Sequence, residues 1–288
     1  MGATVLITGE HSVLGQACLT HLHAQGYQVN TLSVRKDTWK TQPFIATHVL
    51  HVAGLAHVSY KTQDNDLYDS VNHRLAFEVA SKAKADGVKH FIFFSTMLVL
   101  GESTARHKPF DLKASPNPQN PYSQSKHRAE EALQTLADAT FTVTIMRLPF
   151  VYGPMTKGNY QKLSRLAQKL PIFPKTTNQR TMLYIGHLVV WVEALIKNPY
   201  QGIVYPQNEH AVSTSTLFKS IRQAHHKKTL LLPGVGYVLA WLSPLHPTLR
   251  KLFGSFAYGP TTKDPFFVND VHDFETTIRL SEGGAVHG

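Results

Sequence analysis

Cysteine is almost absent from this chain. Cys18 is the only cysteine among 288 residues, so no internal disulfide can form, and this usage suits a reducing compartment. The first residues also lack the features of an export signal, because residues 3–8 enter a strand pattern without a basic start, an apolar core or a cleavage site. We therefore expect a cytoplasmic protein.

Acidic residues are few. Nineteen Asp and Glu stand against 29 Lys and Arg, which gives a formal net charge of +10 and favours anionic partners such as nucleotide diphosphates, an anionic membrane face or nucleic acid. Because the basic residues are scattered, with no run of five, we interpret most of the excess as a generally basic surface and expect no nucleic-acid partner. The 17 histidines are dispersed too, and no metal site is expected.

Charge is missing altogether from residues 229–249. A membrane-spanning helix is not expected there, because prolines and glycines interrupt the segment at Pro233, Gly234, Gly236, Pro244 and Pro247. Packing within a small lobe is the favoured interpretation, and peripheral contact with a membrane or with another subunit, as in a homodimer, is the alternative.

What the chain does contain is an alternation of short apolar runs with helical patterns. Strand patterns cover residues 3–8, 28–34, 48–53, 91–96, 141–147 and 202–205, and helical patterns cover residues 13–24, 66–86, 122–133, 157–170, 188–196 and 213–226. This order predicts an α/β fold with a doubly wound parallel Rossmann sheet and a smaller C-terminal substrate-binding lobe. Only a dozen residues, 36–47, separate the second strand from the third, so one crossover of the usual sheet is expected to be trimmed.

The same patterns predict a division into domains. Residues 1–156 would form the dinucleotide-binding Rossmann domain, and residues 157–288 would form mainly the substrate-binding lobe. About residues 183–206 of that second part are expected to return to the Rossmann domain.

A glycine-containing turn joins the first strand to the first helix. Its spacing is Gly9-x-x-Ser12-x-x-Gly15, and a helix that starts there would offer unpaired N–H groups and a partial positive charge to a pyrophosphate. Ser12 stands where a glycine is usual, yet serine is small enough for a phosphate to approach closely. A plain strand-to-helix turn is the alternative interpretation.

The end of the second strand lacks the acidic residue that would hold an adenosine ribose diol. Ser33, Arg35 and Lys36 stand there instead, and these side chains would accept the 2′-phosphate of NADP. This tilts the cofactor prediction toward NADP without deciding between NAD and NADP.

A tyrosine and a lysine begin the helical pattern that starts near residue 122. Tyr122 and Lys126 are four residues apart, so they share one helix face, and a cation near a phenol favours the phenolate needed for proton transfer. Thr96, at the end of an apolar strand, could hold the alcohol or ketone on which Tyr122 acts. The pair alone recurs on many solvated helices. Its weight comes from the order of glycine turn, hydroxyl-terminated strand and Tyr-x-x-x-Lys.

Taken together, these residues resemble the extended short-chain dehydrogenase/reductase family, in its NAD-dependent sugar epimerase/dehydratase branch and the UDP-glucose 4-epimerase-like members of bacterial surface-polysaccharide pathways. The likeness runs over nearly the whole chain. Its landmarks are residues 8–15, 51–54, 71–72, 95–101 and 122–126, Arg147 with residues 152–154, residues 157–159, and Arg180.

The resemblance implies roles for individual residues. Thr96, Tyr122 and Lys126 would be catalytic, and the cofactor would also be contacted by Gly9, Val13, Leu14, Gly15, Val52, Ala53, Gly54, Leu55, Asn72 and Pro149. Asn159 and Arg180 would grip the nucleotide diphosphate of the sugar, and Ile172 and Phe173 would lie near the uracil. Three departures, at Ser12, at the missing acid and in residues 36–47, fall at the adenosine half.

The leading functional prediction is a nucleotide-sugar 4-epimerase that acts on a UDP-sugar through transient hydride transfer to a nicotinamide cofactor and a 4-keto intermediate. A 4,6-dehydratase is disfavoured, because Met97 and Leu98 follow Thr96 where the dehydratases of the family have Asp-Glu. An NADP-dependent ketosugar or carbonyl reductase and a non-catalytic, cofactor-binding scaffold stay open. A lipid-linked sugar diphosphate is a further substrate hypothesis, suggested by the basic charge and the uncharged segment.

Overall fold

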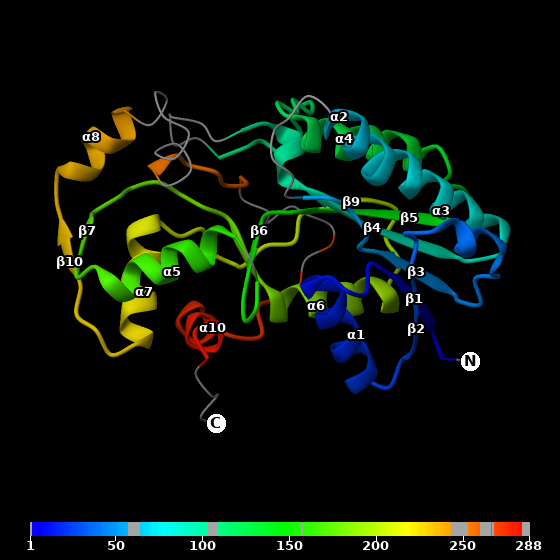
Figure 1. Cartoon of the computed structure of the whole chain (residues 1–288), viewed down its shortest axis with the longest axis horizontal. Helices are drawn as coiled ribbons and strands as arrows, with labels where there is room; N and C mark the ends of the chain where they lie inside the picture. Colours follow the sequence, from blue (N-terminus) through cyan, green and yellow to red (C-terminus); the bar gives the residue numbers. More distant parts are fainter. Residues whose placement is uncertain are drawn as a thin grey trace.

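A six-stranded parallel sheet forms the centre of the molecule (Figure 1). The computed structural model describes residues 2–56, 64–102, 109–156, 158–242, 253–259, 266 and 268–283. The strand order is β2-β1-β3-β4-β5-β9, and every neighbouring pair is parallel. The strands are β1 (Thr4–Thr8), β2 (Gln28–Leu32), β3 (His48–His51), β4 (His90–Thr96), β5 (Thr142–Leu148) and β9 (Gly202–Val204). The predicted Rossmann-like α/β fold is confirmed.

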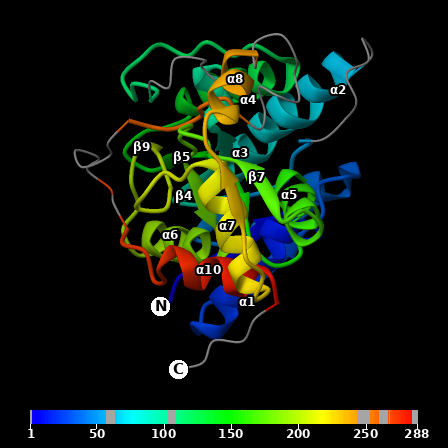
Figure 2. The same ribbon diagram turned by 90° about the vertical axis from the view of Figure 1, so that its left-hand side faces the viewer.

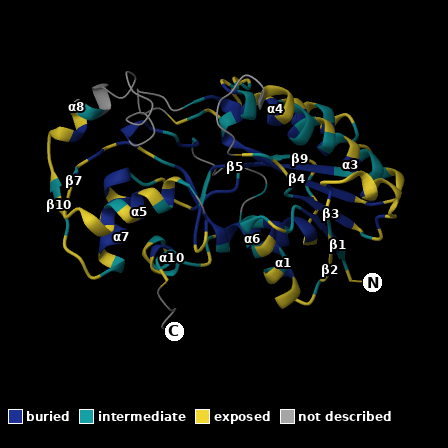
Figure 3. Ribbon diagram, in the orientation of Figure 1, coloured by how far each residue is buried: buried dark blue, intermediate teal, exposed yellow. Residues whose placement is uncertain are grey.

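Helices cover both faces of this sheet (Figure 1). One face carries α1 (Val13–Ala24) and α6 (Ile185–Lys197), and the other carries α3 (Leu75–Ala85) and α4 (Pro121–Gln134). Alternate residues of β1 serve the two layers: Val5 and Ile7 pack with the α1 and α6 side chains, whereas Leu6 packs with those of α3 and α4. Because both faces are covered, β1, β3, β4 and β5 are buried along nearly their whole length (Figure 3), whereas the edge strand β2 is mostly exposed.

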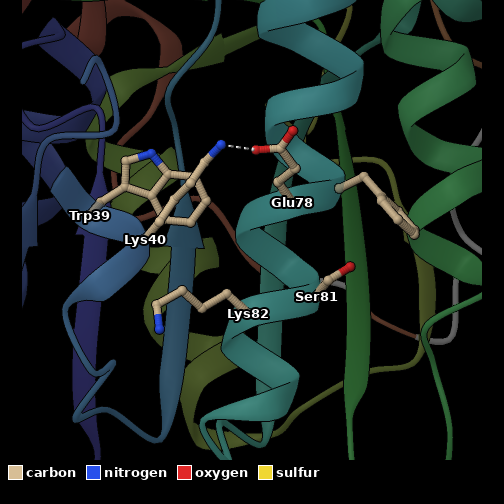
Figure 4. A pocket seen from close by; sticks show the side chains of 6 residues that line it. Trp39, Lys40, Glu78, Ser81 and Lys82 are labelled. Atoms are coloured by element: carbon tan, nitrogen blue, oxygen red, sulfur yellow. Dashed lines mark ion pairs between the residues drawn. The ribbon is translucent and has the colours of Figure 1, made fainter. Parts of the chain in front are cut away.

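The chain order reverses between β1 and β3, which places the expected ligand crevice at the carboxyl ends of these strands. At the neighbouring edge, the trimmed crossover is confirmed: a single 3-10 helix, η1 (Asp37–Thr41), connects β2 to β3 in place of a helix and a strand. Trp39 of η1 is buried against Phe44, and Lys40 pairs with Glu78 of α3 at 3.0 Å. Trp39, Lys40 and Glu78 border a shallow hollow of about 390 Å³ together with Phe77, Ser81 and Lys82 (Figure 4).

One helix departs from its predicted form. The sequence predicts a regular helix over residues 66–86, whereas the structure has α2 (Asp64–Asp69), a π-helical turn (Ser70–Arg74) and then α3. The π turn places Asn72 in a buried position facing α4. The sequence did not predict this turn, because one wider turn hardly changes the spacing of apolar residues along a helix of about twenty residues.

The C-terminal half forms a lobe with its own hydrophobic core (Figure 1). Its helices are α5 (Asn159–Lys169), α7 (Thr214–Ala224), α8 (Val235–Leu242) and α10 (Phe274–Ser281), and its strands are β6 (Phe150–Tyr152) paired with β8 (Met182–Tyr184) and β7 (Ile172–Pro174) paired with β10 (Leu230–Leu232). Ser213 caps α7 as predicted, because its hydroxyl accepts a hydrogen bond from the Thr216 amide at 3.0 Å. Figure 2 looks onto the end of this lobe, with α7 and α8 in front.

Two elements of the C-terminal half lie with the sheet. Helix α6 packs on α1, and β9 extends the sheet beside β5. Within the described residues, no helix is long and apolar enough to cross a membrane. Lys157 and residues 243–249 of the uncharged segment lie outside the described part of the chain.

Candidate active site

The turn between β1 and α1 brings two backbone segments into close contact. Gly9 has a φ of +83°, a conformation that glycine adopts at little cost. A Cβ atom at this position would lie 2.6 Å from the Ala53 amide nitrogen, so the turn packs directly on the segment after β3. A Cβ atom at Gly15 would lie 2.5 Å from the Gly9 carbonyl oxygen. The first and last glycines of the predicted motif are therefore required by the geometry of the turn.

Ser12, the residue that departs from the glycine pattern, is the N-cap of α1. Its hydroxyl accepts a hydrogen bond from the Gly15 amide (3.0 Å) and donates one to the Gly9 carbonyl (2.8 Å). The side chain thus folds back into the turn and satisfies one of the amides that a helix start leaves unpaired. Val13 and Leu14 begin the helix, where amides have no intrahelical acceptor and the helix dipole is positive. This terminus is suited to an anionic group.

The tyrosine of the predicted catalytic trio lies at a well-defined helix start. Asn120 caps α4 by accepting from the Ser123 amide (2.9 Å), and the Ser123 hydroxyl accepts from the Asn120 amide (3.2 Å). Tyr122 follows the cap, and its phenol lies close enough to the side chain of Thr96, at the end of β4, for that side chain to lower the pKa of the phenol. Burial raises the pKa of the Tyr122 phenol to about 12, and the side chain of Thr96 opposes that rise.

Lys126 lies one turn further along α4 and is only 4% exposed. Its ammonium donates to the Phe94 carbonyl at 2.8 Å and lies 4.4 Å from the centre of the Phe93 ring. Burial lowers the pKa of Lys126 to about 7, and the carboxylate of Glu130 acts in the opposite direction. Contacts with Phe93 and Phe94 of β4 therefore fix the Lys126 side chain, and its pKa is close to neutral pH.

The loop after β3 closes the site from the other side. A Cβ atom at Gly54 would lie 3.2 Å from Lys126 Nζ and 3.0 Å from Asn72 Oδ1, so a side chain here would require Lys126 or Asn72 to shift slightly. Asn72 accepts from the Leu55 amide (2.8 Å) and donates to the Leu55 carbonyl and to the Ser125 hydroxyl (3.1 Å each). It therefore ties this loop to α4. π-helical turns such as the one that carries Asn72 are frequent at functional sites.

The remaining predicted cofactor residues lie along the same edge of the sheet. Val52 and Ala53 follow β3, and Pro149 is buried directly after β5. Ser33 and Arg35 follow β2 and are exposed. Because all the strands are parallel, these residues share the carboxyl edge with Thr96.

The predicted substrate residues belong to the lobe and are more dispersed. Arg180 donates to the Thr214 hydroxyl (3.1 Å) and to the Gly254 carbonyl (3.3 Å), and burial lowers its pKa to about 10, so it stays protonated at neutral pH. Asn159 begins α5 and is exposed, and Ile172 on β7 is 45% exposed. Phe173 is 4% exposed, and its ring stacks at 4.3 Å on that of Phe218 in the lobe core. Only the main chain of Phe173 is therefore placed to meet a ligand.

A buried ion pair beneath the trio was not predicted from the sequence. Glu130, one turn after Lys126, pairs with Arg147 of β5 at 2.7 Å, and the Ser95 hydroxyl also donates to its carboxylate. The side chains of Glu130 and Arg147 are 1% and 5% exposed. An acid on the apolar face of the Lys126 helix was the available signal, but its partner lies 17 residues further along the chain. No group of His, Cys, Asp and Glu suited to a metal ion occurs among the described residues.

The sequence also matches a family of known proteins. Residues 5–206 match the sequence model of the family described as "NAD dependent epimerase/dehydratase family". The chain belongs to this family. The matched range runs from β1 to β9 and includes the turn at Gly9 and the helix that carries Tyr122 and Lys126.

Two curated relatives of this chain are epimerases. It is 35% identical over 216 residues to UDP-glucose 4-epimerase of Vibrio cholerae, and 30% identical over 169 residues to N-acetyl-alpha-D-glucosaminyl-diphospho-ditrans,octacis-undecaprenol 4-epimerase of Escherichia coli O157:H7. These matches cover 72% and 56% of this chain, and 64% and 50% of the respective relatives. The chain thus spans between half and two thirds of the length of these relatives.

A solved structure shows the same fold over nearly the whole chain. UDP-glucose 4-epimerase of Thermus thermophilus, crystallised in complex with NAD, superposes with a TM-score of 0.72 at 18% identity and covers 97% of both chains. At this identity the match supports the fold of the epimerase/dehydratase family, including the lobe.

Proposed function

We propose that this protein is an NAD(P)-dependent nucleotide-sugar 4-epimerase. The observation that carries the proposal is the placement of Thr96 beside Tyr122 at the carboxyl edge of a Rossmann sheet, with the buried Lys126 one helical turn away on the same helix. The 35% identity to a UDP-glucose 4-epimerase supports the same reaction class.

The residues at this edge fit a nicotinamide dinucleotide. The contact between Gly9 and Ala53 leaves the start of α1 open to a pyrophosphate, and Val13 and Leu14 supply its amides. Gly54 keeps the space beside Lys126 and Asn72 free of a side chain. When bound, the nicotinamide would supply a reversible two-electron acceptor for the sugar carbon.

Residues of this chain would transfer the proton of the sugar 4-hydroxyl. Tyr122 takes the proton of the sugar 4-hydroxyl and later returns it, while the Thr96 hydroxyl hydrogen-bonds the same oxygen and holds it in line. Because burial disfavours the Tyr122 phenolate, the nearby side chain of Thr96 and the positive charge of Lys126 are needed to make this transfer accessible. Epimerisation would require the 4-keto sugar to turn over within the site, so that its carbon could regain on the opposite face the hydride that a bound nicotinamide would hold.

The substrate class we propose is a UDP-sugar. Arg180, protonated and held by Thr214, and Asn159 at the start of α5 would bind the diphosphate and so orient the sugar from a distance. Ile172 and the main chain of Phe173 would border the base. A lipid-linked sugar diphosphate is a second substrate class, favoured by the name of the E. coli relative.

A panel assay tests the proposal. Purified protein would be incubated with UDP-sugars and with NAD or NADP, the products separated by chromatography and the cofactor followed by its absorbance. Interconversion of 4-epimers without net change of the cofactor is expected. Net oxidation of NADPH would instead select a ketosugar reductase, which the exposed Ser33 and Arg35 favour. Absence of turnover on every UDP-sugar with cofactor binding retained would select a non-catalytic scaffold. An unchanged rate in Tyr122→Phe would remove Tyr122 from its catalytic role.

The expected compartment and assembly accompany this proposal. We expect the protein to act in the cytoplasm, since its one cysteine, Cys18, is buried as a free thiol whose pKa burial raises to about 12. A homodimer is an alternative assembly, and sedimentation equilibrium measures it directly.

A further inference from the structure

The outer surface of the β7 and β10 pair is apolar where a solvated strand face is normally polar. The two strands pair in register, with Phe173 opposite Leu231 and Ile172 opposite Leu230. Phe173 and Leu231 pack into the lobe core. Side chains alternate along a strand, so Ile172, Leu230 and Leu232 point the other way, and they are 45%, 57% and 37% exposed.

This apolar surface continues beyond the two strands. Leu170, just before β7, is 46% exposed, and Val235 and Tyr237 on α8 are 42% and 67% exposed. Six of the ten exposed large apolar side chains in the described part of the chain thus come from residues 170–172 and 230–237. Figure 2 looks onto this end of the lobe, and Figure 3 shows exposed positions along β10. Such concentration is unlike the scattered exposure of single apolar residues on ordinary surfaces.

Basic side chains border the same surface. A hollow of about 440 Å³ lies where α7 leads into β10, and it is lined by Lys219, Gln223, His226, Lys227, Lys228 and Thr229. Lys169 and Lys175 flank β7, and both are exposed. The loop is held in place by Arg222, which donates to the Lys228 carbonyl at 2.6 Å and 2.9 Å. The lysines therefore project from a fixed backbone.

No acidic residue offsets this charge locally. The sequence has neither Asp nor Glu in residues 158–192 or 210–263. Glu282, which reaches α5 and α7 from the other side, is 6% exposed and engaged with His225 and Ser164. The apolar patch and its basic border together form what we call the lobe-end face: Leu170, Ile172, Leu230, Leu232, Val235 and Tyr237 with Lys169, Lys175, Lys219, Lys227 and Lys228.

We propose that the lobe-end face docks on an anionic lipid bilayer. Exposed leucine, valine and tyrosine side chains enter the boundary between headgroups and acyl chains, and lysines at their border meet the negative headgroups. Residues 229–249 carry no charge that would have to be desolvated on entry. A symmetric contact with a second copy would instead place Lys227 and Lys228 of both chains on one shared surface, where they repel.

Vesicle co-sedimentation tests the electrostatic half of the proposal. The wild-type chain is expected to pellet with vesicles of phosphatidylcholine mixed with phosphatidylglycerol, to stay in solution with phosphatidylcholine alone, and to dissociate as salt increases. Lys227→Gln/Lys228→Gln should bind about 30-fold more weakly, since each lysine near an anionic surface contributes about 1 kcal/mol. Lys89→Gln/Lys113→Gln removes the same charge from exposed positions outside the lobe and should bind like the wild type.

A second variant tests the apolar half. Leu230→Ser/Tyr237→Ser changes two side chains that are 57% and 67% exposed, so thermal unfolding should stay at the wild-type temperature while vesicle binding is lost at moderate salt. Equal binding to neutral vesicles, no binding by the wild type, or wild-type binding by the Lys227→Gln/Lys228→Gln variant would overturn the proposal. A dimer that this serine variant abolishes would overturn it too, by assigning the face to a second copy. Turnover of a water-soluble UDP-sugar is measured separately, so loss of vesicle binding and loss of epimerase activity are distinguishable.

Discussion

Replacing Glu130 by alanine tests whether the buried ion pair beneath the catalytic trio holds the site together. Glu130 lies on the same helix as Tyr122 and Lys126, and its carboxylate receives two side chains from the neighbouring strands: the guanidinium of Arg147 and the hydroxyl of Ser95. Ser95 is adjacent to Thr96, so the pair joins the helix that carries the phenol to the strand that carries its hydroxyl partner. Its loss should therefore reduce stability and activity together.

The expected magnitude follows from what alanine leaves behind. Arg147 would keep its charge in a site where the side chain is 5% exposed, and removing one partner of such a buried pair costs about 3–5 kcal/mol. For a chain of this size, that loss corresponds to a decrease in unfolding temperature of about 10 °C. The pKa of Lys126 should also fall below its present value of about 7, because Glu130 is the group that raises it.

Thermal and urea unfolding followed by circular dichroism measure the free energy of unfolding of Glu130→Ala against Glu131→Ala. Glu131 is the next residue of the same helix, but its side chain is 66% exposed and meets only His127 at 3.8 Å, so this control should change stability by less than about 0.5 kcal/mol. The double variant Glu130→Leu/Arg147→Leu should be more stable than Glu130→Ala, because no unpaired charge remains. Equal stability of Glu130→Ala and Glu131→Ala would refute the reasoning.

Three further predictions concern the site and the sheet. Tyr122→Phe should lower epimerase turnover by at least about 100-fold in the product assay while the unfolding temperature changes little, because only the proton-transfer group is removed. Gly9→Ala should unfold at a lower temperature than wild type, or lose nucleotide binding in calorimetry, since its Cβ would lie 2.6 Å from the Ala53 amide; an unchanged variant would contradict this close contact. Acid should destabilise the chain through His51 and His90, whose pKa values burial lowers from 6.5 to about 3. Below pH 6.5 the unfolded state binds protons that the folded state excludes, so the free energy of unfolding should fall by about 1.4 kcal/mol per pH unit for each histidine, and stay level in this respect above pH 6.5. Urea unfolding across this range measures the slope, and a flat profile would contradict it.

The sequence could predict what depends on local spacing. The glycine turn, the Thr96 strand end and the Tyr122 and Lys126 pair are each defined within a few residues, and a parallel sheet brings strand ends to one edge without further information. The trimmed crossover was predictable for the same reason, since twelve residues cannot hold both a helix and a strand.

What the sequence could not predict depends on long-range packing. The pairing of Glu130 with Arg147 joins a helix to a strand, and neither residue carries a local signal of the other. Phe173 was assigned to the substrate by the family resemblance, yet strand alternation at β7 turns its ring into the lobe core and leaves Ile172 outside. Successive residues of a strand point to opposite faces, so only one of two adjacent apolar residues can be buried. Because Ile172 and Phe173 are both apolar, the sequence does not show which of them faces the core.

The departures at the adenosine half have structural consequences that leave the reacting end intact. Ser12 lacks the conformational freedom of a glycine but caps helix α1. Its hydroxyl points back into the turn and away from the amides of Val13 and Leu14. The short connection after β2 folds as η1 and buries Trp39, so the edge strand is supported without a crossover helix. Adenosine contacts can therefore weaken without moving Thr96 or Tyr122, because β4 and α4 are held by the strands β3 and β5, by Asn72 and by the Glu130–Arg147 pair, none of which belongs to the edge strand β2.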